Sequence, residues 1–394
     1  MAAITQAVVL AAGKGERLYP LNTLRPKVML RLANKPILQY VVEALARCGV
    51  REVVLVVGYR REQVQDHFGG GEEFGVEVRY VHQEQQLGTA HALACARGLV
   101  EGRFLVLPGD NIVAPETVAP LLECTEDTVL VKEGVQRRRY GVVLLEGDRV
   151  VDLVEKPQEP ISPWLNTGIY CLDDAVFEVL GGELDLPVAL LRWLRQGHPL
   201  RAVRTEVTWL DAMHPWDLLH LNALALAGTA PRIEGTVEEG ATVRGPVSIG
   251  RGTVVRAGSY IVGPAAIGEG CEVGPGVCVF PHSSVGHQAV LGPWTVVRNS
   301  IIESSVEVGP HSLVHDSVLA QGCTAAGGLA ARCGTFSATV DGETLRVRAG
   351  AIVAEYVELG YGVTLGPGVL VGKGTRVRDG KVVTEGLPED ALVL

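Results

Sequence analysis

The strongest constraint on the fold is a six-residue repeat that begins at Val237. Stepping along the chain by six residues, each position up to Val297 is aliphatic: Val237, Val243, Ile249, Val255, Ile261, Ile267, Val273, Val279, Val285, Leu291 and Val297. The step slips by one residue near Ile302, and a second run follows: Val353, Leu359, Leu365, Val371, Val377 and Val383. Such repeats predict a parallel β-helix, in which the repeated side chains stack inside a prism.

The glycine content supports this prediction. The chain has 48 glycines among 394 residues, and many follow the repeated aliphatic residue directly, as in Ile249-Gly250 and Ile267-Gly268. Glycine destabilises helices but adopts the backbone conformations that prism corners need. The pattern resembles the left-handed hexapeptide-repeat helix, with three repeats per coil. We therefore expect an all-β left-handed β-helix over residues 237–394, with an irregular insertion at about 326–350.

Residues 1–228 predict a different, α/β domain. Short apolar runs end at Gly13, Gly58 and Asp110, and a helix-like stretch such as Ile37–Cys48 lies between them. Strands that alternate with helices imply a Rossmann-like domain with a mixed, mostly parallel sheet, whose ligands bind at the carboxyl ends of the strands. Residues 229–236 are expected to be a linker.

Composition excludes several classes of protein. A formal net charge of −10 argues against broad nucleic-acid binding, and no apolar run is long enough for a transmembrane helix. The N-terminus has no signal-peptide pattern, so we expect a cytoplasmic protein. The eight cysteines form no Cys-X-X-Cys pair, which favours reduced thiols and no zinc site.

A glycine-rich turn follows the first predicted strand and points to phosphate chemistry. Residues 10–18 read Leu-Ala-Ala-Gly-Lys-Gly-Glu-Arg-Leu, and Arg25-Pro26-Lys27 comes shortly after. Backbone N–H groups in such a turn can hold phosphate oxygens, and arginine can bind phosphate through two hydrogen bonds. For the turn taken alone, an ordinary strand-to-helix connection with solvated basic residues is the alternative.

Further motifs follow in an order that identifies a family. They are Gln83 with Leu87-Gly88-Thr89-Ala90-His91-Ala92, Gly109-Asp110-Asn111, Tyr140-Gly141-Val142, Glu155-Lys156-Pro157, Asn166-Thr167-Gly168 and Trp209-Leu210-Asp211. Together with the first turn they resemble the sugar-1-phosphate nucleotidylyltransferases, over essentially the whole chain. The two-domain layout resembles the bifunctional uridylyltransferase–acetyltransferases, especially the archaeal type, whereas Gly109-Asp110-Asn111 resembles the thymidylyltransferases.

The resemblance implies a reaction and a set of roles. The phosphate oxygen of a sugar 1-phosphate attacks the α-phosphorus of a nucleoside triphosphate with Mg²⁺ present, and pyrophosphate leaves. Both reactants are anionic, so positioning and charge neutralisation dominate. The implied catalytic residues are Arg17, Lys27 and Lys156; the nucleotide-binding residues are Leu10, Ala11, Ala12, Gly13, Gly15, Gln83, Gly88 and Thr89; the sugar-binding residues are Gly141, Glu155 and Asn166; and the Mg²⁺ ligands are Asp110 and Asp211.

Each of these sites has a structural alternative when taken alone. Asp110 could cap a turn, Asp211 could accept hydrogen bonds in one, and Glu155-Lys156 could be a solvated charge pair. The order and spacing of all the motifs favour the functional interpretation. One departure concerns Met213, which stands where many relatives have glycine two residues after the aspartate.

The β-helix carries a second, weaker signal. His311 lies at the repeat where the acetyltransferase relatives place their general base, and acetyl-CoA would then be a second substrate. Several sugar-phosphate contacts implied by the resemblance are replaced here: Phe280, Val314, Thr324 and Leu345 stand at those positions, although Arg298 can stand for one lysine. The alternatives are an exposed corner histidine and a β-helix that serves as a scaffold for a homotrimer.

Three functions are therefore compared. The leading hypothesis is a Mg²⁺-dependent nucleotidylyltransferase that joins UTP or dTTP to N-acetylglucosamine 1-phosphate or glucose 1-phosphate. The second adds N-acetylation of glucosamine 1-phosphate. The third is a non-catalytic regulatory subunit that binds nucleotide-sugars. The presence of Arg17, Lys27, Asp110 and Asp211 argues against the third.

Overall fold

The computed structural model describes residues 4–134, 140–207, 211–340 and 343–394. The chain packs as two compact units. The first unit comprises Met1–Lys14, Pro26–Met29 and Ile37–Asp211, and the second comprises Gly15–Arg25, Leu30–Pro36 and Ala212–Leu394. This division differs from the expected limits at 228 and 237, because two N-terminal loops and helix α6 (Asp217–Ala227) pack with the β-helix.

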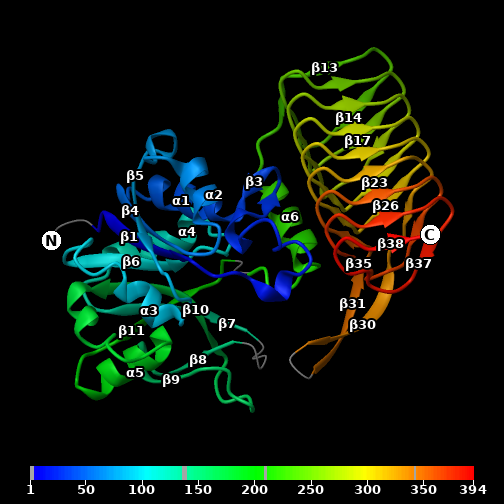
Figure 1. Cartoon of the computed structure of the whole chain (residues 1–394). Helices are drawn as coiled ribbons and strands as arrows, with labels where there is room; N and C mark the ends of the chain where they lie inside the picture. The colour runs from blue at the N-terminus through cyan, green and yellow to red at the C-terminus, as the bar shows by residue number, and fades with distance from the viewer. Residues whose placement is uncertain (1–3, 135–139, 208–210, 341–342) are drawn as a thin grey trace. The chain divides into compact units, whose positions relative to one another are not determined.

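A mixed sheet forms the centre of the first unit, as predicted (Figure 1). Strands β1, β4, β5 and β6 are parallel, β10 runs antiparallel to β6 and β7, and β11 is parallel to β7. The strand bounds are β1 (Gln6–Ala11), β4 (Glu52–Val57), β5 (Glu77–His82), β6 (Arg103–Pro108), β7 (Thr128–Glu133), β8 (Val142–Glu146), β9 (Arg149–Val154), β10 (Trp164–Asp173) and β11 (Arg201–Thr205).

Helices cover both faces of this sheet, because alternate strand residues point to opposite sides. Val8 and Val106 pack in a core with residues of α3 (Thr89–Ala94) and α5 (Leu186–Arg195). Val9 and Leu107 pack in a separate core with α1 (Ile37–Arg47) and α2 (Arg61–Phe68). A short helix, α4 (Pro115–Val118), also contributes to the second core. Burial on both faces explains why these strands are continuous apolar runs.

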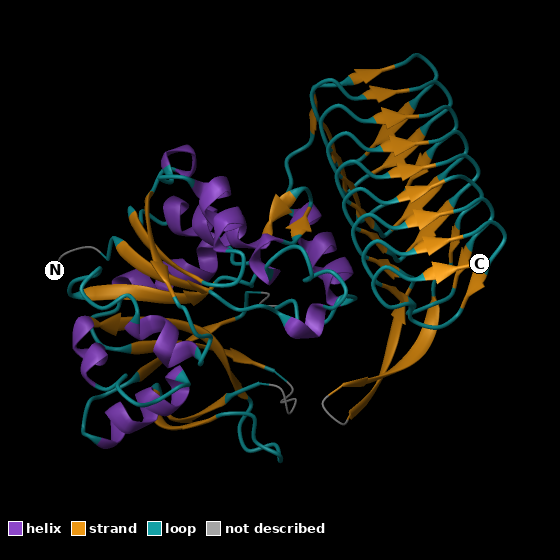
Figure 2. Ribbon diagram, in the orientation of Figure 1, coloured by secondary structure: helices purple, strands orange, loops and turns teal. Residues whose placement is uncertain are grey.

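The second unit contains the β-helix, and its repeat behaves as predicted. Val237, Val255, Val273 and Leu291 pair in parallel register on successive coils, and residues of all three faces fill one core. Figure 2 shows the short strands stacked along the β-helix. The three sheets within the described residues run β12-β15-β18-β21-β24-β27-β32-β35, β13-β16-β19-β22-β25-β28-β33-β36-β38 and β14-β17-β20-β23-β26-β29-β34-β37.

The coil strands are short. Their bounds are β12 (Arg232–Ile233), β13 (Thr236–Val237), β14 (Thr242–Arg244), β15 (Val247–Ile249), β16 (Val254–Val255), β17 (Tyr260–Val262), β18 (Ala265–Ile267), β19 (Glu272–Val273), β20 (Cys278–Val279), β21 (Ser283–Val285), β22 (Val290–Leu291), β23 (Val296–Arg298), β24 (Ile301–Ile302), β25 (Glu307–Val308), β26 (Leu313–His315), β27 (Val318–Leu319), β28 (Thr324–Ala325), β29 (Ala330–Ala331), β32 (Ile352–Val353), β33 (Glu358–Leu359), β34 (Thr364–Leu365), β35 (Leu370–Val371), β36 (Arg376–Val377), β37 (Val382–Val383) and β38 (Leu392–Val393).

The irregular stretch of the repeat is a hairpin rather than a loop. Strands β30 (Gly334–Val340) and β31 (Glu343–Ala349) pair antiparallel with each other. Residues earlier in the expected range of 326–350 still follow the coil, since Ala330–Ala331 pairs with β26 and β34. Alanine in place of a larger aliphatic residue conceals the repeat there.

Asn222 connects α6 to the β-helix. Its side chain is fully buried, its Nδ2 donates to the carbonyl of His282, and its Oδ1 accepts from Ser284 Oγ. The same Oδ1 accepts from the backbone N–H of Ala33, between the two-residue strands β2 (Arg31–Leu32) and β3 (Lys35–Pro36).

Among the described residues, none of the helices is long and apolar enough to cross a bilayer.

Candidate active site

Three parallel strands end at one side of the sheet in the first unit, and several candidate residues lie at or just after these ends. Strands β1, β4 and β6 are neighbours. The turns after them pack closely: Gly109 N donates to Leu10 O at 2.9 Å, and a Cβ at Gly58 would lie 2.7 Å from Ala12 O. This packing brings the Leu10–Gly13 turn and the Gly109-Asp110 turn together, as the sequence predicts.

Lys27 and Asp110 meet in this region. Lys27 begins the short 3-10 helix Lys27–Met29, and its Nζ lies 2.5 Å from Asp110 Oδ2. The Lys27 side chain is 14% exposed and the Asp110 side chain is 27% exposed. A partly buried cation beside a carboxylate provides both signs of charge that a complex of Mg²⁺ and triphosphate requires.

A backbone bridge brings the second candidate aspartate to the same place. Asn111 and Asp211 form an isolated antiparallel bridge, so residues 110 and 211 are close neighbours. Tyr140 Oη donates to Asp211 Oδ1 at 3.1 Å. Asn111 is 1% exposed, and its Oδ1 has no hydrogen-bond partner among the described residues. These oxygen atoms are hard donors of the kind that Mg²⁺ prefers. Trp209 and Leu210 lie outside the described residues.

The three predicted sugar-binding residues also lie together. Asn166 N donates to Gly141 O at 2.9 Å, and a Cβ at Gly141 would lie 2.7 Å from Glu155 Oε2. Lys156 Nζ is 3.5 Å from Glu155 Oε1. Burial raises the pKa of Glu155, although Lys156 opposes the shift. The absence of a side chain at Gly141 therefore leaves room for the Glu155 carboxylate beside the Gly141 backbone.

A bulge in β10 aims Asn166. The pairing of β10 with β7 shifts register between Asn166 and Tyr170, and Gly168 has a φ of +77° inside the bulge. The Asn166 amide is held by the buried Tyr170 hydroxyl and by the N–H of Gly168. Thr167 Oγ1 donates to Leu130 O at 2.6 Å and secures the other side of the strand. Bulges commonly redirect a side chain in this way beside functional sites.

Three of the predicted nucleotide-binding residues, Gln83, Gly88 and Thr89, lie at one tight turn. Gln83 is 3% exposed, and its Nε2 contacts both Gly88 O and His91 Nδ1. Gly88 has a φ of +135°, and a Cβ there would overlap the carbonyl oxygen of Leu184. Thr89 Oγ1 accepts from Leu186 N at 2.8 Å. Residues 184–186 therefore shape the turn, although no motif in the sequence marks them.

The remaining candidates lie in the second unit. Gly15 and Arg17 belong to the loop Gly15–Arg25, where Gly15 has a φ of +69° and Arg17 is exposed. His311 is exposed at a corner of the β-helix with a φ of +55°. Val314, which stands where the resemblance implies a tyrosine, is fully buried inside the prism. It cannot contact a substrate beside His311.

Comparison with known proteins shows the family of the chain. Residues 6–225 match the family described as Nucleotidyl transferase. The chain belongs to this family. The match covers more than half of the chain and includes β1 to β11, with the turns that hold Lys27, Asp110 and Asp211.

Two curated relatives illustrate what this nucleotidyl transferase is similar to. The chain is 34% identical over 260 residues to "Bifunctional protein GlmU" of Methanococcus maripaludis, covering 64% of this chain and 61% of that protein. It is 34% identical over 265 residues to a glucose-1-phosphate thymidylyltransferase of Streptomyces antibioticus, covering 64% and 74% respectively. The matched region spans less than two thirds of the GlmU protein.

Solved structures also resemble the nucleotidyl transferase over more than half of its length. A putative glucose-1-phosphate thymidylyltransferase from Bacillus anthracis, in complex with a sucrose, aligns with a TM-score of 0.53 at 29% identity. The alignment covers 57% of this chain and 95% of that chain. The inositol-1-phosphate CTP transferase from T. maritima aligns with a TM-score of 0.51 at 22% identity, which supports the fold alone.

Proposed function

We propose that the protein transfers a nucleotidyl group from UTP or dTTP to a sugar 1-phosphate and releases pyrophosphate. The observation that carries this proposal is the meeting of Lys27, Asp110 and the Asn111–Asp211 bridge at the carboxyl ends of the parallel strands. The cluster of Gly141, Glu155 and Asn166 adds a polar surface in the same unit.

In this proposal Asp110 and Asp211 hold Mg²⁺. The ion neutralises phosphate charge when it is bound. The orphaned Asn111 Oδ1 beside them supports the fit, because a buried carbonyl oxygen without a donor suits a hard cation or its water. Tyr140 restrains Asp211 through its hydrogen bond.

The other residues bind and orient the two anions. The triphosphate is bound by the Leu10–Gly13 turn together with Gly15, Arg17 and Lys27. The positive side chains of Arg17 and Lys27 stabilise the leaving pyrophosphate. Lys156 neutralises the sugar phosphate so that its oxygen can approach the α-phosphorus. The oxygen forms a bond to that phosphorus as the bond to pyrophosphate breaks.

Recognition of the organic groups is assigned to the two polar clusters. Gln83, Gly88 and Thr89 form the nucleobase side. Gly141, Glu155 and Asn166 bind sugar hydroxyls or an N-acetyl group. The name of the thymidylyltransferase relative supports glucose 1-phosphate as an acceptor, and the motif Leu87–Ala92 adds N-acetylglucosamine 1-phosphate through its resemblance to the uridylyltransferases.

A pyrophosphate-release assay tests the proposal. Full-length protein is given UTP or dTTP with each of a panel of sugar 1-phosphates, with Mg²⁺ or with chelator. We expect Mg²⁺-dependent turnover with at least one pair, which Asp110→Ala abolishes and Asp66→Ala preserves. Asp66 is a matched control because it is exposed on α2. Absence of turnover with every pair would refute the proposal and favour a regulatory nucleotide-sugar-binding subunit.

For the β-helix we propose a scaffold that assembles a homotrimer. Exposed aromatic side chains on its coils, Trp294, Tyr356 and Tyr361, support an interaction surface. Acetyl transfer is the second candidate, because His311 lies at the repeat where the resemblance to the acetyltransferases implies a general base. Thiol release from acetyl-CoA with glucosamine 1-phosphate separates the two, and a rate that His311→Ala leaves unchanged would reject His311 as the base. Light scattering measures the oligomeric state.

A further inference from the structure

One corner of the β-helix gathers side chains that a scaffold does not need. Most coils repeat every eighteen residues, but Arg298 pairs with His315 and Leu313 pairs with Ala330, which are seventeen apart. This is the register slip that the sequence shows near Ile302. Extending these registers by one or two residues relates Asn299 to Asp316 and Asp316 to Cys333, and Cys333 directly precedes the hairpin β30–β31.

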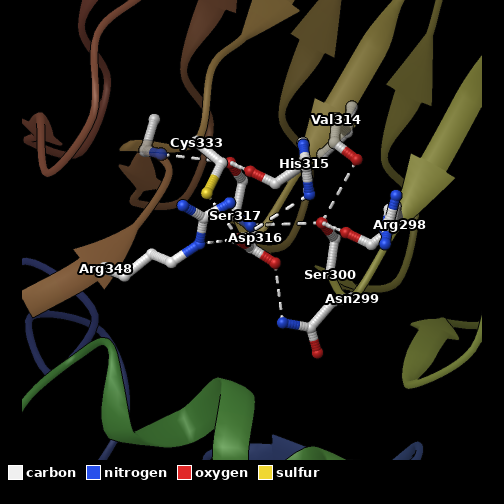
Figure 3. Close-up of polar contacts among 10 residues, drawn as sticks. Arg298, Asn299, Ser300, Val314, His315, Asp316, Ser317, Cys333 and Arg348 are labelled. Atoms are coloured by element: carbon white, nitrogen blue, oxygen red, sulfur yellow. Dashed lines mark hydrogen bonds and ion pairs between the residues drawn. The ribbon is translucent and has the colours of Figure 1, made fainter. Parts of the chain in front are cut away.

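The side chains of this corner converge on one carboxylate, as Figure 3 shows. Cys333 Sγ donates to Asp316 Oδ2 at 2.6 Å, and His315 Nε2 lies 3.7 Å from the same oxygen. The three ligand atoms all lie within 4.8 Å of one another. Asp316 is 8% exposed, while Cys333 and His315 are half-buried. The cluster is therefore largely shielded but still reachable from solvent.

We propose that Cys333, His315 and Asp316 form a Zn²⁺ site, which lies in the second unit and does not depend on the proposed nucleotidyl transfer. Thiolate, imidazole and carboxylate are each ligands that zinc binds, and three protein ligands with water as the fourth is the arrangement of open zinc sites. Mg²⁺ does not favour such a set, because it prefers oxygen donors alone. The spacing of cysteines in the sequence gave no sign of this site, since only one cysteine takes part.

The geometry fits after a small adjustment. Tetrahedral Zn²⁺, with bonds of about 2.0–2.3 Å, separates its ligand atoms by roughly 3.3–3.6 Å. The His315–Asp316 distance of 3.7 Å is already near that value. The Cys333–Asp316 distance must open from 2.6 Å by about 1 Å as the thiol proton is lost and the sulfur binds the metal.

A neighbouring residue orients the carboxylate for this role. Asn299 Nδ2 donates to Asp316 Oδ1 at 2.7 Å, which leaves Oδ2 directed to Cys333 and His315 (Figure 3). Hydrogen bonds to the second oxygen of a metal-binding carboxylate commonly fix its orientation and strengthen binding.

The side chain of Arg348 competes with the metal ion for the Asp316 carboxylate. Arg348 Nε lies 3.9 Å from Asp316 Oδ2 and compensates the carboxylate when no metal is bound. The Arg348 side chain is 66% exposed, so it can turn into solvent. Two anionic ligands then balance Zn²⁺ without Arg348. Removal of Arg348 should therefore strengthen metal binding, an effect opposite to that of removing a ligand.

The site would secure the base of the hairpin. Cys333 directly precedes β30, and Gly350, directly after β31, donates its N–H to Asp316 O at 2.7 Å. Zn²⁺ bound to Cys333 and Asp316 would join the first strand of the hairpin to the coil that already holds its second strand.

The test uses tag-free full-length protein, treated with chelator and dialysed into excess MgCl₂, so that the Asp110 and Asp211 site is occupied. Calorimetry with ZnCl₂ should give one site per chain. Titration with Co²⁺ should give a thiolate-to-cobalt charge-transfer band and the strong visible bands of tetrahedral cobalt. No stoichiometric binding, or cobalt binding without the thiolate band, overturns the proposal.

Matched variants assign the ligands. Cys333→Ser and His315→Gln should each weaken Zn²⁺ binding by about 100-fold or more, and Asn299→Ala by about 10-fold. Cys278→Ser removes another half-buried thiol and should change nothing, whereas Arg348→Ala should tighten binding. If Cys333→Ser melts differently from the parent in chelator, His315→Gln decides the question. Unchanged affinity in either ligand variant refutes the assignment.

Discussion

Arg25 anchors the loop Gly15–Arg25 to the β-helix through a buried ion pair, and its removal should be strongly destabilising. Its Nη1 lies 3.0 and 3.2 Å from the two oxygens of Glu303, and its Nη2 donates to Gln321 Oε1 at 2.7 Å. The side chains of Arg25 and Glu303 are 13% and 7% exposed. Removing one partner of a buried pair leaves an uncompensated charge, which costs about 3–5 kcal/mol.

Urea denaturation of the full chain measures this cost. We expect Arg25→Met to lower the free energy of unfolding by about 3–5 kcal/mol, and Glu303→Gln by a similar amount. The double variant should lose much less than the sum of the two, because neither charge is then left alone. A loss of unfolding free energy below about 1 kcal/mol in the single variants would show that the ion pair behaves like an exposed one. That result, or a loss in the double variant equal to the sum of the two single losses, would contradict the prediction of a buried, coupled pair.

Three further predictions follow from single sites. Burial and the nearby Glu303 raise the pKa of Glu355 above 4.5, so the ionised form of Glu355 destabilises the fold at neutral pH. Glu355→Gln should therefore raise the free energy of unfolding by about 1 kcal/mol at pH 7. This gain should fade as the pH falls through the raised pKa, because Glu355 is then protonated in the parent protein as well. A gain that persists at low pH would contradict this. Gly88→Ala should destabilise the fold by at least about 2 kcal/mol, because the new Cβ overlaps the backbone carbonyl of Leu184. The control Gly98→Ala has open space around the new Cβ and should cost only about 1 kcal/mol. Equal losses of the two variants in thermal unfolding would argue against the overlap. Lys27→Met should lower kcat about 100-fold or more, and an unchanged kcat would remove Lys27 from the phosphate site.

The repeat in the sequence predicted the β-helix well, because each coil depends on one stacked aliphatic position. The prediction weakened where that position is small: Ala325 and Ala331 still occupy the core, yet they do not stand out in the sequence. The hairpin and its bounds depend on pairing between β30 and β31, which the six-residue pattern does not encode.

The candidate site shows the same contrast between local and long-range information. Short motifs indicated Lys27, Asp110 and Asp211 individually. Their proximity depends on the bridge between Asn111 and Asp211, two residues a hundred positions apart, and on an ion pair across the sheet edge. Leu184, which shapes the turn at Gly88, carries no chemical signal because it acts through its backbone carbonyl.

The most direct test of the central claim is product formation by the full chain with Mg²⁺, a nucleoside triphosphate and a sugar 1-phosphate. Mass spectrometry would identify the nucleotide-sugar while pyrophosphate is measured in the same reaction. We predict the two products in a one-to-one ratio, lost together in Asp110→Asn and in Asp211→Asn. Pyrophosphate release without a nucleotide-sugar, or full activity in either variant, would contradict the account.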